Sequence, residues 1–91
     1  MFRRKFNYND VVRVRPGIKY WNDVPGRRTS GPRIGEPACI FAVDADRAAG
    51  QRPEFPSGVI YGVEFEGGDA IEVHESDLEL VEKGKIDRAA N

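Results

Sequence analysis

Glycine and proline are spread so densely along this chain that a long helix is not expected. The 91 residues include ten glycines and six prolines, and no stretch of ten positions shows a clean apolar repeat of 3.6 residues. The repeat that does recur has a period of two, which is the spacing of side chains on one face of a β-strand. The sequence therefore predicts an all-β protein made of short strands.

Five segments carry this period-two pattern and are predicted as strands: residues 10–15, 38–43, 59–66, 70–74 and 78–81. Gly67 and Gly68 follow the third segment at once and predict a tight turn in which both residues take a positive φ. Eight apolar residues lie on the same face of their strands in the alternating pattern, so we expect them to pack together in the core. They are Val12, Val14, Ile40, Val63, Phe65, Ile71, Val73 and Leu78. Five such strands bury their apolar faces most economically as a small, strongly bent antiparallel barrel.

Two long loops interrupt the strands, at residues 16–37 and 44–58, and proline and glycine exclude long regular elements from them. The best candidates for a helix are residues 44–49 and 76–80, each of one or two turns, and residues 75–77 are expected to form a short 3₁₀ turn. The length of the chain favours one domain. We expect an N-terminal arm at residues 1–8, the barrel at residues 9–82 and a C-terminal tail at residues 83–91.

Charge is distributed unevenly along the chain, although the net charge is only −1. Residues 1–35 hold nine basic and two acidic residues, whereas residues 36–91 hold five basic and thirteen acidic residues. If this separation survives folding, the arginines of the first loop and the glutamates of the later strands lie on different sides. An acidic face of that kind would steer a basic partner. The alternative is that the opposite charges meet in the fold and cancel.

No catalytic or metal-binding constellation is evident in the sequence, and none is expected. His74 is the only histidine and is predicted to face outward at a strand end, away from any nucleophile. Cys39 lies inside an apolar strand, which is typical of a small buried hydrophobe rather than a reactive thiolate. The acidic residues around His74 match neither a calcium loop nor a zinc motif. The sequence therefore predicts a protein that is not an enzyme and carries no cofactor.

Candidate partner-binding residues fall into three groups. Tyr20 and Trp21 are residue types that dominate interface hot spots. Arg27 and Arg28 lie in a loop that lacks the ending of a phosphate-binding P-loop. Together with other cations and aromatic residues of the N-terminal part, they could grip a nucleic-acid backbone and stack bases, namely Arg33, Arg3, Arg4 and Lys5 with Phe2, Phe6, Tyr8, Tyr20 and Trp21. The predicted acidic face comprises Glu64, Glu66, Glu72 and Glu79.

The strand residues also resemble a known superfamily. Residues 9–14, residues 61–65 followed by the glycine pair, and residues 73–81 resemble the SH3-like barrels, including their Tudor, KOW and nitrile-hydratase-accessory versions. The nearest likeness is to the small SH3-like immunity proteins of bacterial polymorphic-toxin systems, which end in a similar Glu-Ser-Asp-Leu-Glu stretch. The resemblance covers about a third of the chain and neither long loop.

The resemblance implies a non-catalytic protein-binding module, an immunity-type inhibitor whose partner is a basic toxin domain. The alternative is a Tudor- or KOW-like accessory domain that binds nucleic acid or a ribonucleoprotein through the basic loop. No apolar run approaches the roughly 20 residues that span a bilayer, and a single cysteine excludes an internal disulfide. We therefore expect a cytoplasmic protein with no membrane partner.

Overall fold

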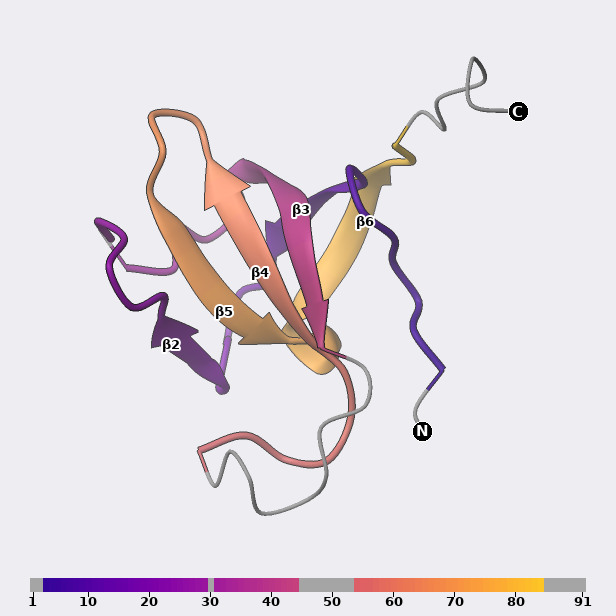
Figure 1. Cartoon of the computed structure of the whole chain (residues 1–91). Coiled ribbons are helices and arrows are strands. Elements are labelled where there is room, and N and C mark those ends of the chain that lie inside the picture. The colour runs from indigo at the N-terminus through magenta and orange to yellow at the C-terminus, as the bar shows by residue number, and fades with distance from the viewer. Residues whose placement is uncertain (1–2, 30, 45–53, 85–91) are drawn as a thin grey trace.

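The computed structural model describes residues 3–29, 31–44 and 54–84, and the strands of these residues form one antiparallel β-sheet (Figure 1). The strands are β1 (Val11–Val14), β2 (Trp21–Asp23), β3 (Pro37–Asp44), β4 (Ile60–Phe65), β5 (Ala70–His74) and β6 (Leu78–Glu82), with one 3₁₀ turn, η1 (Glu75–Asp77). Their order across the sheet is β2-β5-β4-β3-β1-β6. The all-β antiparallel prediction is confirmed.

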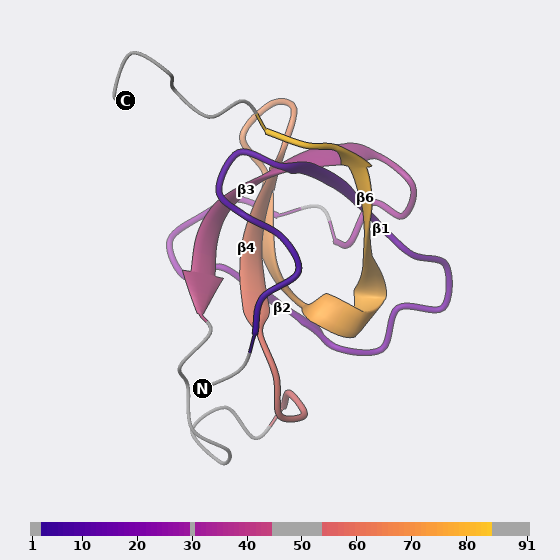
Figure 2. The ribbon, with the colours of Figure 1, turned by 90° about the vertical axis from the view of Figure 1, so that its right-hand side faces the viewer.

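The sheet is strongly bent, but strand pairing does not close it into a barrel. β2 and β6 are its two edges. In Figure 2, β3 and β4 form one side of the molecule, and β1 and β6 form the other. Three strands lie between β5 and β6 in the sheet order, yet only the three residues of η1 join them along the chain. Because this connection is short, the sheet must bend strongly, so that β5 and β6 both lie next to the same core.

The predicted core is confirmed. All eight residues are buried within one apolar cluster: Val12, Val14, Ile40, Val63, Phe65, Ile71, Val73 and Leu78. Tyr61 of β4 belongs to the same cluster, and so does Phe6, which comes from the segment predicted as an N-terminal arm. The Phe6 ring packs edge-on against Tyr61 with the ring centroids 5.4 Å apart. The arm is therefore part of the folded core at this position.

β2 is the strand that the sequence did not predict, and it lies inside the expected loop of residues 16–37. It has only three residues, and its register with β5 pairs Trp21 with Val73 and Asp23 with Ile71. A segment of three residues is too short to show alternation. β2 forms because β5 offers it a free edge.

The β4–β5 hairpin turns through three residues, 66–68, rather than through the two glycines alone. The Phe65 amide donates to the Asp69 carbonyl at 2.8 Å, and the Gly68 amide donates to the Phe65 carbonyl at 3.1 Å. Gly67 and Gly68 have φ values of 95° and 97°, so the predicted positive φ at both positions is confirmed. Residues other than glycine rarely adopt that backbone conformation.

The predicted turn at residues 75–77 is confirmed as η1. It does not continue through residues 78–80, because Leu78 begins β6. The other predicted helical segment, residues 44–49, lies outside the described residues after position 44, and most of the predicted tail does so as well. Among the residues that the structure describes, no helix is long and apolar enough to cross a membrane.

Candidate functional site

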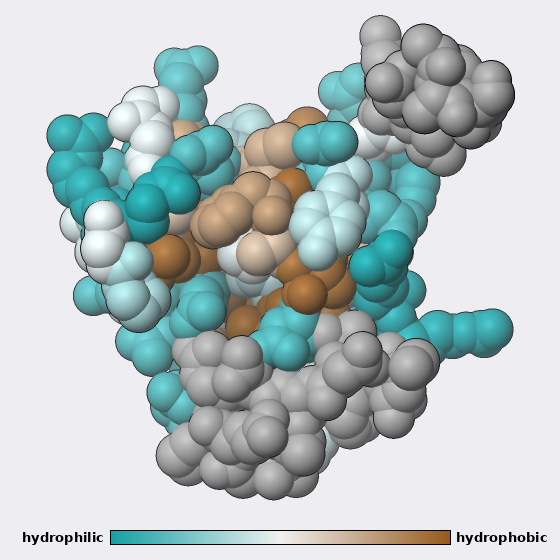
Figure 3. All heavy atoms as spheres, in the orientation of Figure 1, coloured by the Kyte–Doolittle hydropathy of each residue, from teal (hydrophilic) through white to brown (hydrophobic). Residues whose placement is uncertain are grey.

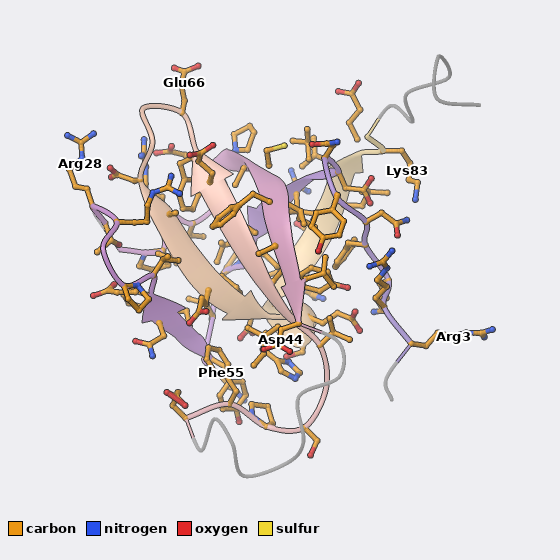
Figure 4. All side chains as sticks on the ribbon, in the orientation of Figure 1. Arg3, Arg28, Asp44, Phe55, Glu66 and Lys83 are labelled. Atoms are coloured by element: carbon orange, nitrogen blue, oxygen red, sulfur yellow. The ribbon has the colours of Figure 1, made fainter. Side chains whose placement is uncertain are left out.

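Three arginines from the loop of residues 24–36 bind the β4–β5 hairpin. Arg27 forms an ion pair with Glu64 and donates to the Gly68 carbonyl at 2.9 Å. Arg28 Nε lies 2.8 Å from Asp69 Oδ1, although its own side chain remains 77% exposed and extends away from the fold (Figure 4). Arg33 Nη1 lies 3.5 Å from Asp69 Oδ2. These contacts hold the basic loop against the acidic hairpin.

Of the two alternatives for the charges, the structure therefore supports pairing and not separation in space. Arg27 and Glu64 were expected on different sides of the molecule, but they pair directly. Arg33 reaches the same hairpin and also pairs with Glu36 at 2.8 Å. Both charges occur in one small fold, and the antiparallel hairpin places its carboxylates beside the loop. The arginines of this loop and the carboxylates of the hairpin, although distant along the chain, therefore pair in the structure.

The four glutamates of the predicted acidic face do not form one free surface. Glu64 pairs with Arg27, and Glu79 pairs with Arg13 across the β1–β6 ladder. Glu72 is half-buried in β5, opposite Asn22 of β2. Glu66 is exposed and points away from the tip of the hairpin (Figure 4). The acidic residues consequently stabilise the fold more than they present a continuous face to a partner.

Tyr20 and Trp21 lie at an edge of the sheet. Their side chains are 36% and 37% exposed, which is a large fraction for rings of this size. The Tyr20 amide donates to the buried carboxylate of Asp77 at 2.9 Å, and its ring packs edge-on against His74. Trp21 begins β2, whose outer edge pairs with no other strand of the described residues. The two rings are therefore anchored by their backbone and free to contact a partner.

His74 is buried, so the prediction that it faces outward is wrong. Its Nε2 lies 3.0 Å from the Ser57 carbonyl, and its Nδ1 lies 3.2 Å from the Ser76 amide and 2.8 Å from Ser76 Oγ. Because a carbonyl only accepts, Nε2 carries the ring proton and Nδ1 accepts. Gly58 lies so close that a Cβ there would be 2.7 Å from Nε2. His74 thus holds the loop before β4 in place and forms the N-terminal cap of η1.

Cys39 is half-buried rather than fully buried. It lines a shallow hollow of about 310 Å³ together with Pro37, Glu64 and Glu66. In the view of Figure 3, the sheet exposes apolar atoms, and hydrophilic residues surround them. No group of three His, Cys, Asp or Glu side chains in the described part of the chain could hold a metal ion.

Comparison with protein-family models, with curated proteins and with solved structures finds no match to this chain.

Proposed function

We propose that this chain is a non-catalytic protein-binding module, and that its contact surface is centred on Tyr20 and Trp21. The observation that supports this most is the position of the two residues, which follow one another at an open sheet edge and are both partly exposed. Tryptophan and tyrosine supply most of the binding energy in many protein interfaces because they bury a large area at little conformational cost.

The finer proposal is that the module is an SH3-like barrel acting as an immunity-type inhibitor of a toxin. The strong bend of the six-stranded sheet supports the first part, since it brings β5 and β6 together through three residues. The acidic face contributes less than its sequence suggested, because Glu64 and Glu79 already pair with arginines of the same chain. Glu66, at the exposed hairpin tip, remains available to contact a basic toxin domain.

The alternative of a nucleic-acid-binding domain that uses Arg27 and Arg28 has weaker support. Both guanidinium groups are paired with carboxylates of the hairpin. A phosphate would have to displace those carboxylates before it could bind there.

Trp21 is the only tryptophan of the chain, so its fluorescence reports on the proposed surface alone. The test captures proteins from a lysate of the host with the unaltered protein and with Trp21→Ala. A Tyr8→Ala variant serves as the control, because Tyr8 is also an exposed aromatic residue. The Tyr8→Ala variant should still capture a specific partner, and the Trp21→Ala variant should lose it. For Trp21→Ala we expect the binding free energy to weaken by about 2 kcal/mol or more. Its addition in purified form shifts the Trp21 emission.

The immunity proposal has a separate test. The product of the neighbouring gene is expressed in bacteria with and without this protein, and growth and enzymatic activity are measured. Growth rescue by the unaltered protein, but not by Trp21→Ala, supports an inhibitor. A lysate in which no protein depends on Trp21 contradicts the choice of surface.

A further inference from the structure

The backbones of three basic residues, Lys5, Arg15 and Lys19, contact η1, at the end of the molecule opposite the tip of the β4–β5 hairpin (Figure 1). The Lys5 amide donates to Glu75 Oε2 at 2.9 Å, the Arg15 amide to the Asp77 carbonyl at 2.8 Å, and the Lys19 amide to Asp77 Oδ2 at 3.1 Å. In Figure 2, η1 lies between the N-terminal segment and the loop that joins β1 to β2. Three basic residues that are distant in sequence are thus placed around one short turn.

The cationic groups at this end have no carboxylate bound to them. Within residues 3–29, 31–44 and 54–84, none of the side chains of Arg3, Arg4, Lys5, Arg15 and Lys19 forms an ion pair, and all five are exposed. The four other arginines of the N-terminal third, Arg13, Arg27, Arg28 and Arg33, are all paired. Folding therefore neutralises one part of the basic segment and leaves the part around η1 free.

The two carboxylates of η1 are already engaged by neutral donors. Asp77 is buried, and its carboxylate accepts from the amides of Lys19 and Tyr20. Glu75 accepts from the Tyr61 hydroxyl at 2.6 Å and from the Lys5 amide. Their negative charge remains, but five cationic side chains exceed two carboxylates. The geometry of both carboxylates is fixed by these bonds, so neither can swing out to pair with a lysine.

Exposed aromatic rings stand among these cations. Tyr8 is 51% exposed and lies under the Arg4 guanidinium, 5.8 Å from its carbon to the ring centroid. Tyr20 directly follows Lys19, and its ring stands on edge against His74. Cations that track a backbone, combined with rings on which bases stack, are the two devices with which proteins bind single strands without sequence preference. A site that binds an acidic protein surface would need the cations but not the exposed aromatic rings.

We propose that the surface beside η1 that carries Lys5, Arg15 and Lys19, together with Arg4, Tyr8 and Tyr20, binds single-stranded nucleic acid. The sequence hypothesis joined the N-terminal cations and aromatic residues to Arg27 and Arg28; the site proposed here excludes those two arginines, which are paired with the hairpin, and adds Arg15 and Lys19. It is a second activity beyond the proposed protein-binding function: the two surfaces share Tyr20, but the cations belong to this site alone and Trp21 to the other alone.

The test is fluorescence anisotropy with labelled single-stranded RNA and DNA of about 16 nucleotides, the upper site size of comparable single-strand-binding folds. The variants are Lys5→Gln/Arg15→Gln/Lys19→Gln and the control Arg28→Gln, which removes an exposed cation outside the site. Circular dichroism first confirms that each variant is folded. The backbone bonds to η1 do not depend on these side chains, so the triple variant retains them.

The expected dissociation constant for the unaltered protein is about 1–100 µM near physiological salt, the range of contacts made mainly to phosphates. The triple variant binds at least about tenfold more weakly, and its plot of log K against log salt is flatter by about 2, since each phosphate contact on a single strand contributes about 0.7. Arg28→Gln behaves as the unaltered protein does, and so does Trp21→Ala. Tyr20→Leu weakens binding with no change in the salt slope.

Three results would overturn the proposal. The first is no binding of either oligomer at low salt. The second is equal binding by the triple variant and the unaltered protein. The third is preferential binding to vesicles that contain anionic lipid, measured by sedimentation, with no competition from the oligomers. Loss of partner capture by Trp21→Ala bears only on the protein-binding function, so the two proposals can fail separately.

Discussion

At the scale of single residues, Asp10 joins segments from both ends of the chain. It is 1% exposed. Its Oδ2 accepts from the Asn7 amide at 2.9 Å and its Oδ1 from the Gly84 amide at 2.7 Å, while its carbonyl accepts from the Ile40 amide at 3.0 Å. Gly84 approaches so closely that a Cβ would lie 2.5 Å from the Asn9 backbone. The carboxylate thus holds the start of β1 against residue 7 and against the segment after β6, and the carbonyl of the same residue holds it against β3.

Replacing Asp10 by Asn should therefore destabilise the fold. The amide group can accept at only one of its two ends, so either the Asn7 or the Gly84 amide loses its acceptor. Leaving one donor unsatisfied at a buried position costs about 1–3 kcal/mol. Urea denaturation measures the loss, with Glu66→Gln as the same chemical change at an exposed site. Equal unfolding midpoints for the two variants would contradict the assigned role.

Tyr61 makes the stability of the fold sensitive to alkaline pH. Burial, and after it the hydrogen bond to Glu75, raises the pKa of the Tyr61 hydroxyl above its ordinary value of 10.0. Above pH 10 the unfolded chain therefore loses this proton while the folded chain keeps it. The unfolded state then binds fewer protons, so the free energy of unfolding falls as the pH rises. Below pH 10 both states are protonated and the contribution is complete.

The expected result is a decline in the urea midpoint between about pH 9 and pH 11 that Tyr61→Phe removes in part. Tyr61→Phe is also less stable at neutral pH, because the Phe6 amide loses its acceptor, the Tyr61 hydroxyl oxygen at 3.1 Å. Tyr8→Phe, at an exposed ring, serves as the control and keeps the full decline. An identical slope for Tyr61→Phe and the unaltered protein would exclude this linkage.

At the scale of elements, the loop of residues 24–36 and the β4–β5 hairpin form one structural unit. The Arg27 guanidinium contacts Glu64 on one side and lies over the Phe41 ring of β3, 5.4 Å from its centroid. Phe41 in turn covers Gly62, where a Cβ would lie 2.9 Å from the ring. The glycine in β4 leaves the space for the ring, and the ring supports the arginine.

A double-mutant cycle with Arg27→Gln and Glu64→Gln measures this unit directly. Both side chains are partly exposed, at 34% and 44%, so we expect a coupling free energy of about 0.2–1 kcal/mol, as in other pairs near the surface. The coupling should shrink in high salt because mobile ions screen the pair. A coupling of zero at low salt would mean that the pair of Arg27 with Glu64 does not help to hold the loop, which then depends on its other contacts with the hairpin and with Phe41.

The elements also show which features could be predicted from the sequence and which could not. Strands β4 and β5 and the core were predicted because alternation is a local pattern, and the positive φ of Gly67 and Gly68 follows from residue type. β2 was missed because only its pairing with β5 defines it. The burial of His74 and the pairing of Arg27 with Glu64 were missed for the same reason, since each depends on segments distant in sequence. For His74, the serine at position 76 was the one local signal.

At the scale of the whole molecule, the N-terminal segment packs against the open side of the bent sheet. Phe6 is 6% exposed, and the amides of Lys5 and Phe6 both donate to the Tyr61 hydroxyl, at 3.2 and 3.1 Å. The sheet leaves its edges β2 and β6 unpaired to each other, so strand hydrogen bonds do not seal the core. Phe6 supplies part of the covering that a closed barrel would obtain from its own strands.

Phe6→Ala should therefore remove a large share of the total stability. Truncating a buried phenylalanine costs about 3–5 kcal/mol, whereas a chain of this length has roughly 5–14 kcal/mol in all. Thermal and urea unfolding measure the loss. Tyr8→Ala is the matched control, because Tyr8 lies two residues away and is 51% exposed, and its replacement should change stability by about 0.5 kcal/mol or less. If Phe6→Ala does not fold, Phe6→Leu should fold with intermediate stability, since leucine refills most of the space. Equal stabilities for Phe6→Ala and Tyr8→Ala would show instead that the strands protect the core without the N-terminal segment.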